Sequence, residues 1–274
     1  MLKITEPTYY LPEVQALLGV HVLSSGSTEP MLIRGVETSS GKRGQYVVKF
    51  MNAPRMNTQA ACREMLGVWI GKQLDLNVAE PVKIVIGDAF VDTIIGRNGY
   101  QNARNSVGDN YGCVFAAGYM ELINGQTFLA NPLLEQAKNI FAFDTFVSNA
   151  DRGAGKPNVL TNGENFMIYD HELAFSFVML LPFLRNKTPW ILGEAEKELF
   201  EKHHFYPYLR RNQFDFQAFV ARFGELDNHF WNSAKKWLPP EWWSNQTEEI
   251  KQYLGAIVEH RKTFAEELTK ILLP

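Results

Sequence analysis

One stretch of the chain gathers side chains suited to phosphate chemistry. It runs from Asn149 through a glycine-rich loop to Asn158, and then on to Asp170. Phosphoryl transfer needs a group that orients or deprotonates the attacking hydroxyl, and oxygen ligands for magnesium. Asp151 suits the first task. Asn158 and Asp170 suit the second, while Lys156 can neutralise charge on the transferred group. Each residue alone would more often cap or turn the backbone, but together they predict a phosphotransferase site.

A lysine and a glutamate upstream could form the opposite wall of this site. The β-branched and aromatic run at residues 45–50 is typical of a strand and contains Lys49, which would otherwise face solvent. Residues 57–74 predict a helix that is apolar nearly all round and contains Glu64. Because an unpaired carboxylate is costly to bury, we expect Glu64 to pair with Lys49. Kinases use such a pair to hold the lysine that contacts the nucleotide phosphates.

A hydroxyl-rich loop at residues 24–28 separates two strand-like runs, at 20–23 and 31–36. Small side chains let backbone N–H groups approach phosphate oxygens closely. The predicted contacts are Ser25, Gly26 and Ser27. A plain hairpin turn is the alternative, since the chain has no GxxxxGK[ST] phosphate loop.

A second segment could bind the base of a nucleotide. Strand character over residues 114–120 leads into Glu121, Leu122 and Ile123, just before Asn124-Gly125. In a two-lobed kinase the hinge falls here, and its backbone would take the adenine. A strand that simply ends in a turn is the other interpretation.

Composition favours a globular protein. Of 274 residues, 46% are hydrophobic and 13% aromatic, enough to bury a core. The net charge of -3 gives no general attraction to nucleic acid or to anionic membranes, so we expect neither as a direct partner. The longest apolar run, 175–184, is too short to span a bilayer, and we expect a cytoplasmic location. Cys62 and Cys113 lack metal-ligand spacing and are expected to be free thiols.

The two halves of the chain differ in pattern. Residues 1–123 are mainly strand-like, with a polar loop expected over 97–112, whereas residues 124–274 are mainly helical apart from a hairpin around Asn162-Gly163. Asp144, among aromatic residues of a helix that begins near Asn131, is expected to bond to nearby backbone or to the loop that follows. Helical spacing also marks 194–204, 214–223, 228–237 and 247–273. Adjacent histidines at 203 and 204 do not share a helix face, so no metal site is expected there.

Three short runs carry a family resemblance: residues 143–152, 156–160 and 168–171. They resemble the HipA-like kinases, and above all the compact branch with the pattern N-x-D-R … N-P-N-L-L … I-D-H. The resemblance covers roughly residues 20–180. It implies an α+β, two-lobed protein-kinase-like fold, with a β-rich N-terminal lobe (1–123) and a mainly helical C-terminal lobe (124–274). It also implies a serine/threonine protein kinase that uses ATP and Mg²⁺ and acts on a protein substrate, with a regulatory protein as a further potential partner.

Roles follow from this resemblance by position. Lys49 would contact the phosphates, with Glu64 as its anchor. Asp151 would be catalytic, and Asn158 and Asp170 would bind magnesium. The hydroxyls of the loop at 24–28 would be sites of autophosphorylation, which would repel ATP.

One spacing departs from the kinase pattern. Asn158 lies two residues further from Asp151 than in H-R-D-x-x-x-x-N. Two alternatives therefore stay open beside a protein kinase. One is a small-molecule or lipid kinase on the same fold, and the other is a nucleotide-binding pseudokinase whose magnesium geometry is spoiled.

Overall fold

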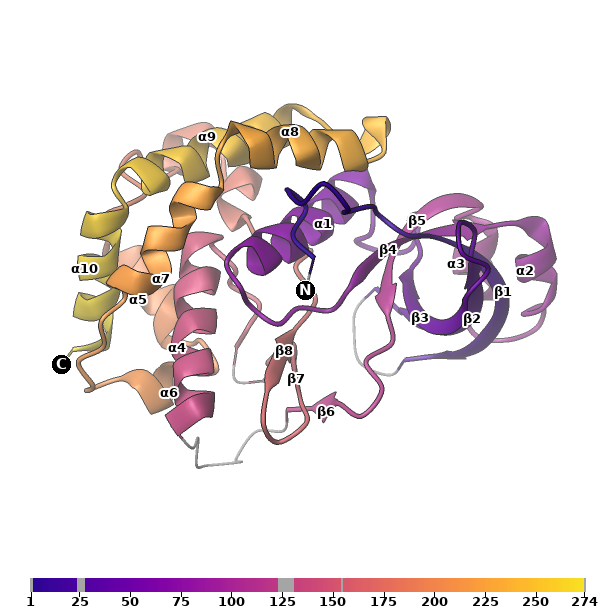
Figure 1. Ribbon diagram of the computed structural model, residues 1–274, viewed down its shortest axis with the longest axis horizontal. Coiled ribbons are helices and arrows are strands. Elements are labelled where there is room, and N and C mark those ends of the chain that lie inside the picture. Colours follow the sequence, from indigo (N-terminus) through magenta and orange to yellow (C-terminus); the bar gives the residue numbers. More distant parts are fainter. Residues whose placement is uncertain (1, 24–27, 123–130, 154, 274) are drawn as a thin grey trace.

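The computed structural model describes residues 2–23, 28–122, 131–153 and 155–273. Strands gather on one side of the molecule and helices on the other, with helix α1 between them (Figure 1). The chain thus has a β-rich N-terminal region and a helical C-terminal region, as the sequence predicted. The predicted contacts Ser25, Gly26, Ser27 and Ile123, and the expected boundary at 123/124, lie outside the described residues.

The N-terminal strands close into a barrel in the order β1-β2-β3-β5-β4. Their bounds are Glu13–Val22 (β1), Met31–Glu37 (β2), Arg43–Lys49 (β3), Pro81–Ile86 (β4) and Gly108–Val114 (β5), and two short helices, α2 (Asp88–Asp92) and α3 (Tyr100–Arg104), link β4 to β5. The barrel closes because β1 pairs antiparallel with β2 on one edge and parallel with β4 on the other. Barrel closure leaves no unpaired edge strand.

The prediction of a loop over residues 97–112 is wrong. The segment contains α3 and most of β5, which pairs with both β3 and β4. Gly112 shows why: a Cβ there would lie 2.2 Å from Ile84 Cδ1 and 2.7 Å from the Val47 carbonyl oxygen. Close packing between two neighbouring strands therefore selects glycine, and the local sequence loses its strand signal.

Helix α1 (Thr58–Gln73) is buried on nearly every side, as its apolar composition predicted. Its first turn is capped by Asn57, whose side-chain oxygen accepts the Ala60 N–H at 2.9 Å. Gly67 lets the helix approach the segment that follows Asp170, because a Cβ at this position would lie 2.5 Å from His171 Cβ. The helix therefore links the barrel to the C-terminal region.

The C-terminal region contains a group of helices and a small sheet. The helices are α4 (Asn131–Phe146), α5 (Glu194–Glu201), α6 (Tyr206–Leu209), α7 (Gln217–Ala221), α8 (Asn228–Trp237), α9 (Asn245–Glu259) and α10 (Arg261–Leu272), with 3-10 turns η1 (Ser176–Met179), η2 (Pro182–Leu184), η3 (Arg222–Glu225) and η4 (Pro240–Trp242). The segment 247–273, expected to be helical, is divided between α9 and α10, because the backbone leaves helical geometry at His260.

The small sheet joins residues from both sides of the 123/124 boundary. Its strands are β6 (Met120–Glu121), β7 (Val159–Thr161) and β8 (Phe166–Ile168), in that order, and β7 and β8 form the predicted hairpin. The expected strand over 114–120 is replaced by the end of β5, irregular backbone and β6.

Both cysteines are free thiols, as expected, with Cys62 buried and Cys113 half-buried. Among the helices that the structure describes, none combines the length and the apolar character needed to cross a membrane.

Gly67 should be intolerant of a side chain. We expect Gly67→Ala to lower the free energy of unfolding by about 2 kcal/mol, because the new methyl group would overlap His171. The control is Gly255→Ala in α9, where no atom lies within 4 Å of the added Cβ. There alanine should stabilise the helix by about 0.5–1 kcal/mol, because an unfolded chain with alanine loses less backbone entropy on folding than one with glycine. Urea unfolding measures both, and equal effects would contradict the close approach of α1 to His171.

Candidate active site

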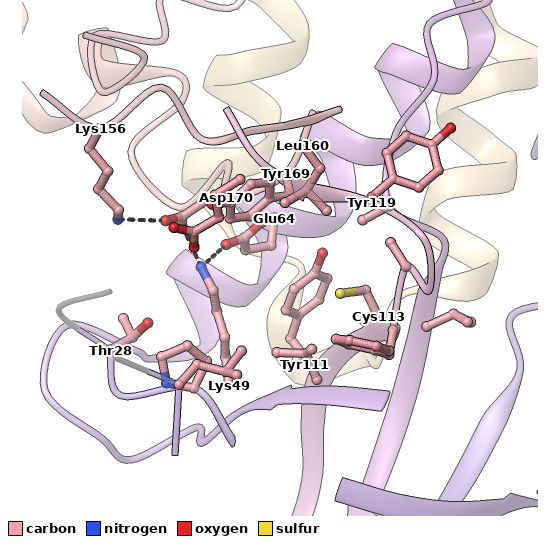
Figure 2. A pocket seen from close by; sticks show the side chains of 18 residues that line it. Thr28, Lys49, Glu64, Tyr111, Cys113, Tyr119, Lys156, Leu160, Tyr169 and Asp170 are labelled. Atoms are coloured by element: carbon pink, nitrogen blue, oxygen red, sulfur yellow. Dashed lines mark hydrogen bonds and ion pairs between the residues drawn. The ribbon is translucent and has the colours of Figure 1, made fainter. Parts of the chain in front are cut away.

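The Lys49 ammonium group, at the end of β3, lies within a buried cluster of carboxylates. It donates hydrogen bonds to Glu64 on α1, to Asp170 Oδ1 at 2.5 Å and to Glu172 Oε2 at 3.1 Å. Figure 2 shows Lys49 pointing at Glu64 and Asp170. Burial alone would lower the pKa of Lys49, but the three carboxylates raise it well above its usual range. The structure thus forms the expected pair of Lys49 with Glu64, and adds two partners to it.

A second lysine contacts Asp170 from the opposite side. Asp170 Oδ2 accepts a hydrogen bond from Lys156 Nζ at 2.8 Å (Figure 2). Burial alone would raise the pKa of Asp170, but Lys49 and Lys156 hold it below its usual range. The Asp170 backbone has φ of 63°, a conformation that side-chain-bearing residues adopt at a cost of about 1–2 kcal/mol. Such strain is found preferentially at functional sites.

The loop between α4 and β7 brings Asp151 and Asn158 together despite their wide spacing. Asn158 Nδ2 donates to Asp151 Oδ2 at 3.0 Å. Within the same loop, the Lys156 N–H donates to the Gly153 carbonyl at 3.2 Å. Asn158 has φ of 50°, which asparagine tolerates better than most residues. The wider spacing therefore does not separate the two side chains.

Asp144 holds this loop in place from the end of α4. Its carboxylate accepts hydrogen bonds from Asn149 Nδ2 at 2.8 Å, Arg152 Nε at 2.5 Å and His203 Nε2 at 2.9 Å. Arg152, itself fully buried, donates from Nη1 to the Asn158 carbonyl oxygen. The expectation that Asp144 bonds to the following loop is confirmed, and the network extends to the peptide group of Asn158.

His203 belongs to this network through both of its ring nitrogens. Its Nδ1 accepts the Phe205 N–H at 3.1 Å, so Nε2 carries the proton that is donated to Asp144. The neighbouring His204 N–H donates to the Arg152 carbonyl at 2.8 Å. Nothing in the local sequence indicated this role, because the partners lie 59 positions apart.

The residues predicted to bind magnesium fit that ion. Asn158 Oδ1 is buried and has no hydrogen-bond partner among the described residues. Asp170 supplies a carboxylate whose charge is balanced here by two lysines. Amide and carboxylate oxygens are the ligands that Mg²⁺ prefers.

A cavity of about 320 Å³ lies beside the Lys49 cluster. Its polar wall includes Thr28, Lys49, Lys156 and Asp170. Figure 2 shows Tyr111, Cys113 and Tyr119 along the other side. The apolar lining includes Leu23, Val47, Ala79, Cys113, Tyr119 and Leu160, none of which the sequence predicted to contact a ligand. A cavity with one charged end and one apolar side suits a ligand that has a charged part and an apolar part.

The segment predicted to bind adenine only partly faces this cavity. Glu121 lines it. The Leu122 side chain is buried in the core, and its N–H donates to the Val159 carbonyl at 2.9 Å. The Leu122 backbone donor is therefore part of the small sheet.

His203 should make stability depend on pH. Burial lowers the pKa of His203 from its ordinary value of 6.5, and Asp144 only partly opposes this. At low pH the unfolded chain therefore protonates His203 more readily than the folded chain does. The contribution of His203 to stability is fully present above pH 6.5 and is lost as the pH falls below that value. We expect His203→Gln to flatten the fall in unfolding free energy below about pH 6.5 by up to about 1.4 kcal/mol per pH unit. Urea unfolding at several pH values measures this.

The exposed His229, which contacts the Thr5 carbonyl, provides the control. His229→Gln should leave the wild-type slope in place. An unchanged slope in His203→Gln would contradict the role assigned to His203.

The chain matches a known protein family over residues 20–269, described as HipA-like kinase. None of the curated proteins compared with the chain matches it. Among solved structures, it is similar to the crystal structure of the Helicobacter pylori proinflammatory kinase CtkA. That similarity has 16% sequence identity and a TM-score of 0.48, and covers 91% of this chain and 94% of that chain. Because the family match spans most of its length, the chain belongs to the HipA-like kinase family.

Proposed function

We propose that this protein is an ATP- and magnesium-dependent kinase that phosphorylates serine or threonine in proteins. One observation carries the proposal: the ammonium group of Lys49, bound to Glu64 and Asp170, forms the charged end of a cavity of about 320 Å³. A buried lysine aimed into a cavity suits the phosphates of a nucleotide, and the apolar side suits its base. The barrel and the helical region would act as the two lobes, with a boundary near residues 123/124.

Asp151, Asn158 and Asp170 would carry out the chemistry. Asp151 would accept or orient the proton of the attacking hydroxyl. Asn158 and Asp170 would hold magnesium, which when bound neutralises charge on the phosphate oxygens. Lys156 would stabilise charge on the transferred group. The hydrogen bond between Asp151 and Asn158 supports an enzyme over a binding-only module, because both predicted functional groups lie at one place.

An exposed apolar surface favours a macromolecular acceptor over a small polar one. Ser176, the first residue of η1, lies next to the start of the loop between α4 and β7, because its Oγ donates to the Ser148 carbonyl at 2.8 Å. Beyond it, Leu181, Phe183 and Leu184 are 58%, 74% and 60% exposed. Three exposed apolar side chains within four positions of the chain are a feature of protein-binding surfaces.

Two aspartate substitutions should separate chemistry from binding. We expect Asp151→Ala to reduce γ-phosphate transfer from ATP into lysate proteins at least about 100-fold, because the proton-accepting group is lost. Thermal stabilisation by ATP with magnesium should remain in this variant. Asp170→Asn should lose the magnesium-dependent part of that stabilisation. The matched control is Asp92→Ala, at an exposed position in α2. Undiminished transfer by Asp151→Ala would overturn the assignment.

Transfer to the chain itself should also occur. Thr28 is buried and lines the cavity, next to the hydroxyl-rich segment that the sequence singled out. Incubation with ATP and magnesium should add phosphoryl groups among Ser24, Ser25, Ser27 and Thr28, as measured by intact mass and peptide mapping. Asp151→Ala should add none. Absence of phosphate in the wild-type protein under conditions where it labels other proteins would contradict self-transfer.

A further inference from the structure

We propose that Glu172 is a positioning residue for Lys49 whose charge makes nucleotide binding depend on the metal ion. This inference rests on the proposed kinase function and assigns a task to a residue that neither the sequence motif nor the family match singles out. The side chain of Glu172 is 5% exposed and touches the nucleotide-facing lysine directly, at 3.1 Å.

The three hydrogens of the Lys49 ammonium group match three carboxylates. Glu64, Asp170 and Glu172 each accept one hydrogen bond from Nζ. The remaining oxygens of two of them are also used: Glu64 Oε2 accepts the His171 N–H at 2.8 Å, and Asp170 Oδ2 accepts Lys156. A single glutamate would suffice to hold the lysine, so the third carboxylate adds negative charge beyond that need.

The charges around the cavity end show the consequence. Five charged side chains line the cavity: two lysines (Lys49 and Lys156) and three carboxylates (Glu64, Glu121 and Asp170), which together carry one net negative charge. The Glu172 carboxylate contacts Lys49, and the Arg63 guanidinium contacts the Glu172 carbonyl oxygen, so these two further charges balance each other in the count. The phosphates of a metal-free nucleotide would meet this negative field without a metal ion to offset it. A nucleotide that arrives with Mg²⁺ brings the missing positive charge. Removing the Glu172 charge should therefore favour the metal-free nucleotide most.

The Glu172 backbone is held independently of its carboxylate. Arg63 Nε donates to the Glu172 carbonyl oxygen at 2.6 Å, and Arg63 Nη1 donates to Gln246 at 2.8 Å. Glutamine at position 172 would keep both contacts and could still accept a hydrogen bond from Lys49. The change Glu172→Gln thus removes a charge with little change of shape.

The test measures dissociation constants of a non-hydrolysable ATP analogue by calorimetry, once with Mg²⁺ and once with a chelator. We expect Glu172→Gln to lower the dissociation constant measured with the chelator about tenfold. The dissociation constant measured with Mg²⁺ should fall less than about threefold. The ratio of the two constants should therefore fall, whereas a merely structural change would shift both constants alike. Glu172→Asp keeps the charge and should keep the wild-type ratio.

A buried glutamate elsewhere is the matched control. Glu267 in α10 accepts from Lys270 at 2.6 Å and is 8% exposed, and Glu267→Gln should leave the ratio unchanged. If Glu172→Gln keeps the wild-type ratio of the two dissociation constants, or if Glu172→Gln and Glu172→Asp give the same ratio, the role assigned to Glu172 is wrong. The proposed kinase function would not be affected by that result. No nucleotide binding by the wild-type protein in either condition would instead overturn the proposed function, and this inference with it. If Glu172→Gln fails to fold, Glu172→Met tests the charge, and failure of both to fold would assign the carboxylate to folding.

Discussion

The buried ammonium group of Lys49 is the contact on which the arrangement of the site depends. It joins three parts of the chain that are distant in sequence: β3, α1 and the segment after β8. Burying carboxylates without a counter-charge costs several kcal/mol each, so Glu64, Asp170 and Glu172 can lie together only around a cation. The same charge that holds the barrel against the C-terminal region is the one that would bind phosphate.

A second buried network performs the corresponding task on the other side of the site. Asp144 accepts hydrogen bonds from Asn149, Arg152 and His203. Arg152 in turn donates to the backbone carbonyl of Asn158. Loops are ordinarily the most variable part of a fold, and this one carries several predicted functional side chains. Buried charge at its base anchors the loop where Asn158 contacts Asp151.

The site combines features that would be unfavourable in a purely structural core. Asn158 and Asp170 both have left-handed backbones. Asn158 Oδ1 is buried without a partner among the described residues, and carboxylates outnumber lysines around Lys49. The unsatisfied acceptor and the surplus of carboxylates would both be relieved by a cation that arrives with a ligand. The stability of the free protein and the function proposed for it are thus opposed at the same atoms.

Local patterns in the sequence predicted most of the residues of the candidate site. The spacing of Asp151, Asn158 and Asp170, the helix around Glu64 and the lysine inside a strand were all readable, because periodicity and polar residues in apolar runs are local signals. Glu172 and His203 were missed, since each acts through a partner 123 or 59 positions away. β5 was missed because its glycine is selected by neighbouring strands. Sequence alone therefore determined which groups could do chemistry. Only the tertiary structure decided which of them meet, because pairing of buried charges depends on long-range packing that no local pattern encodes.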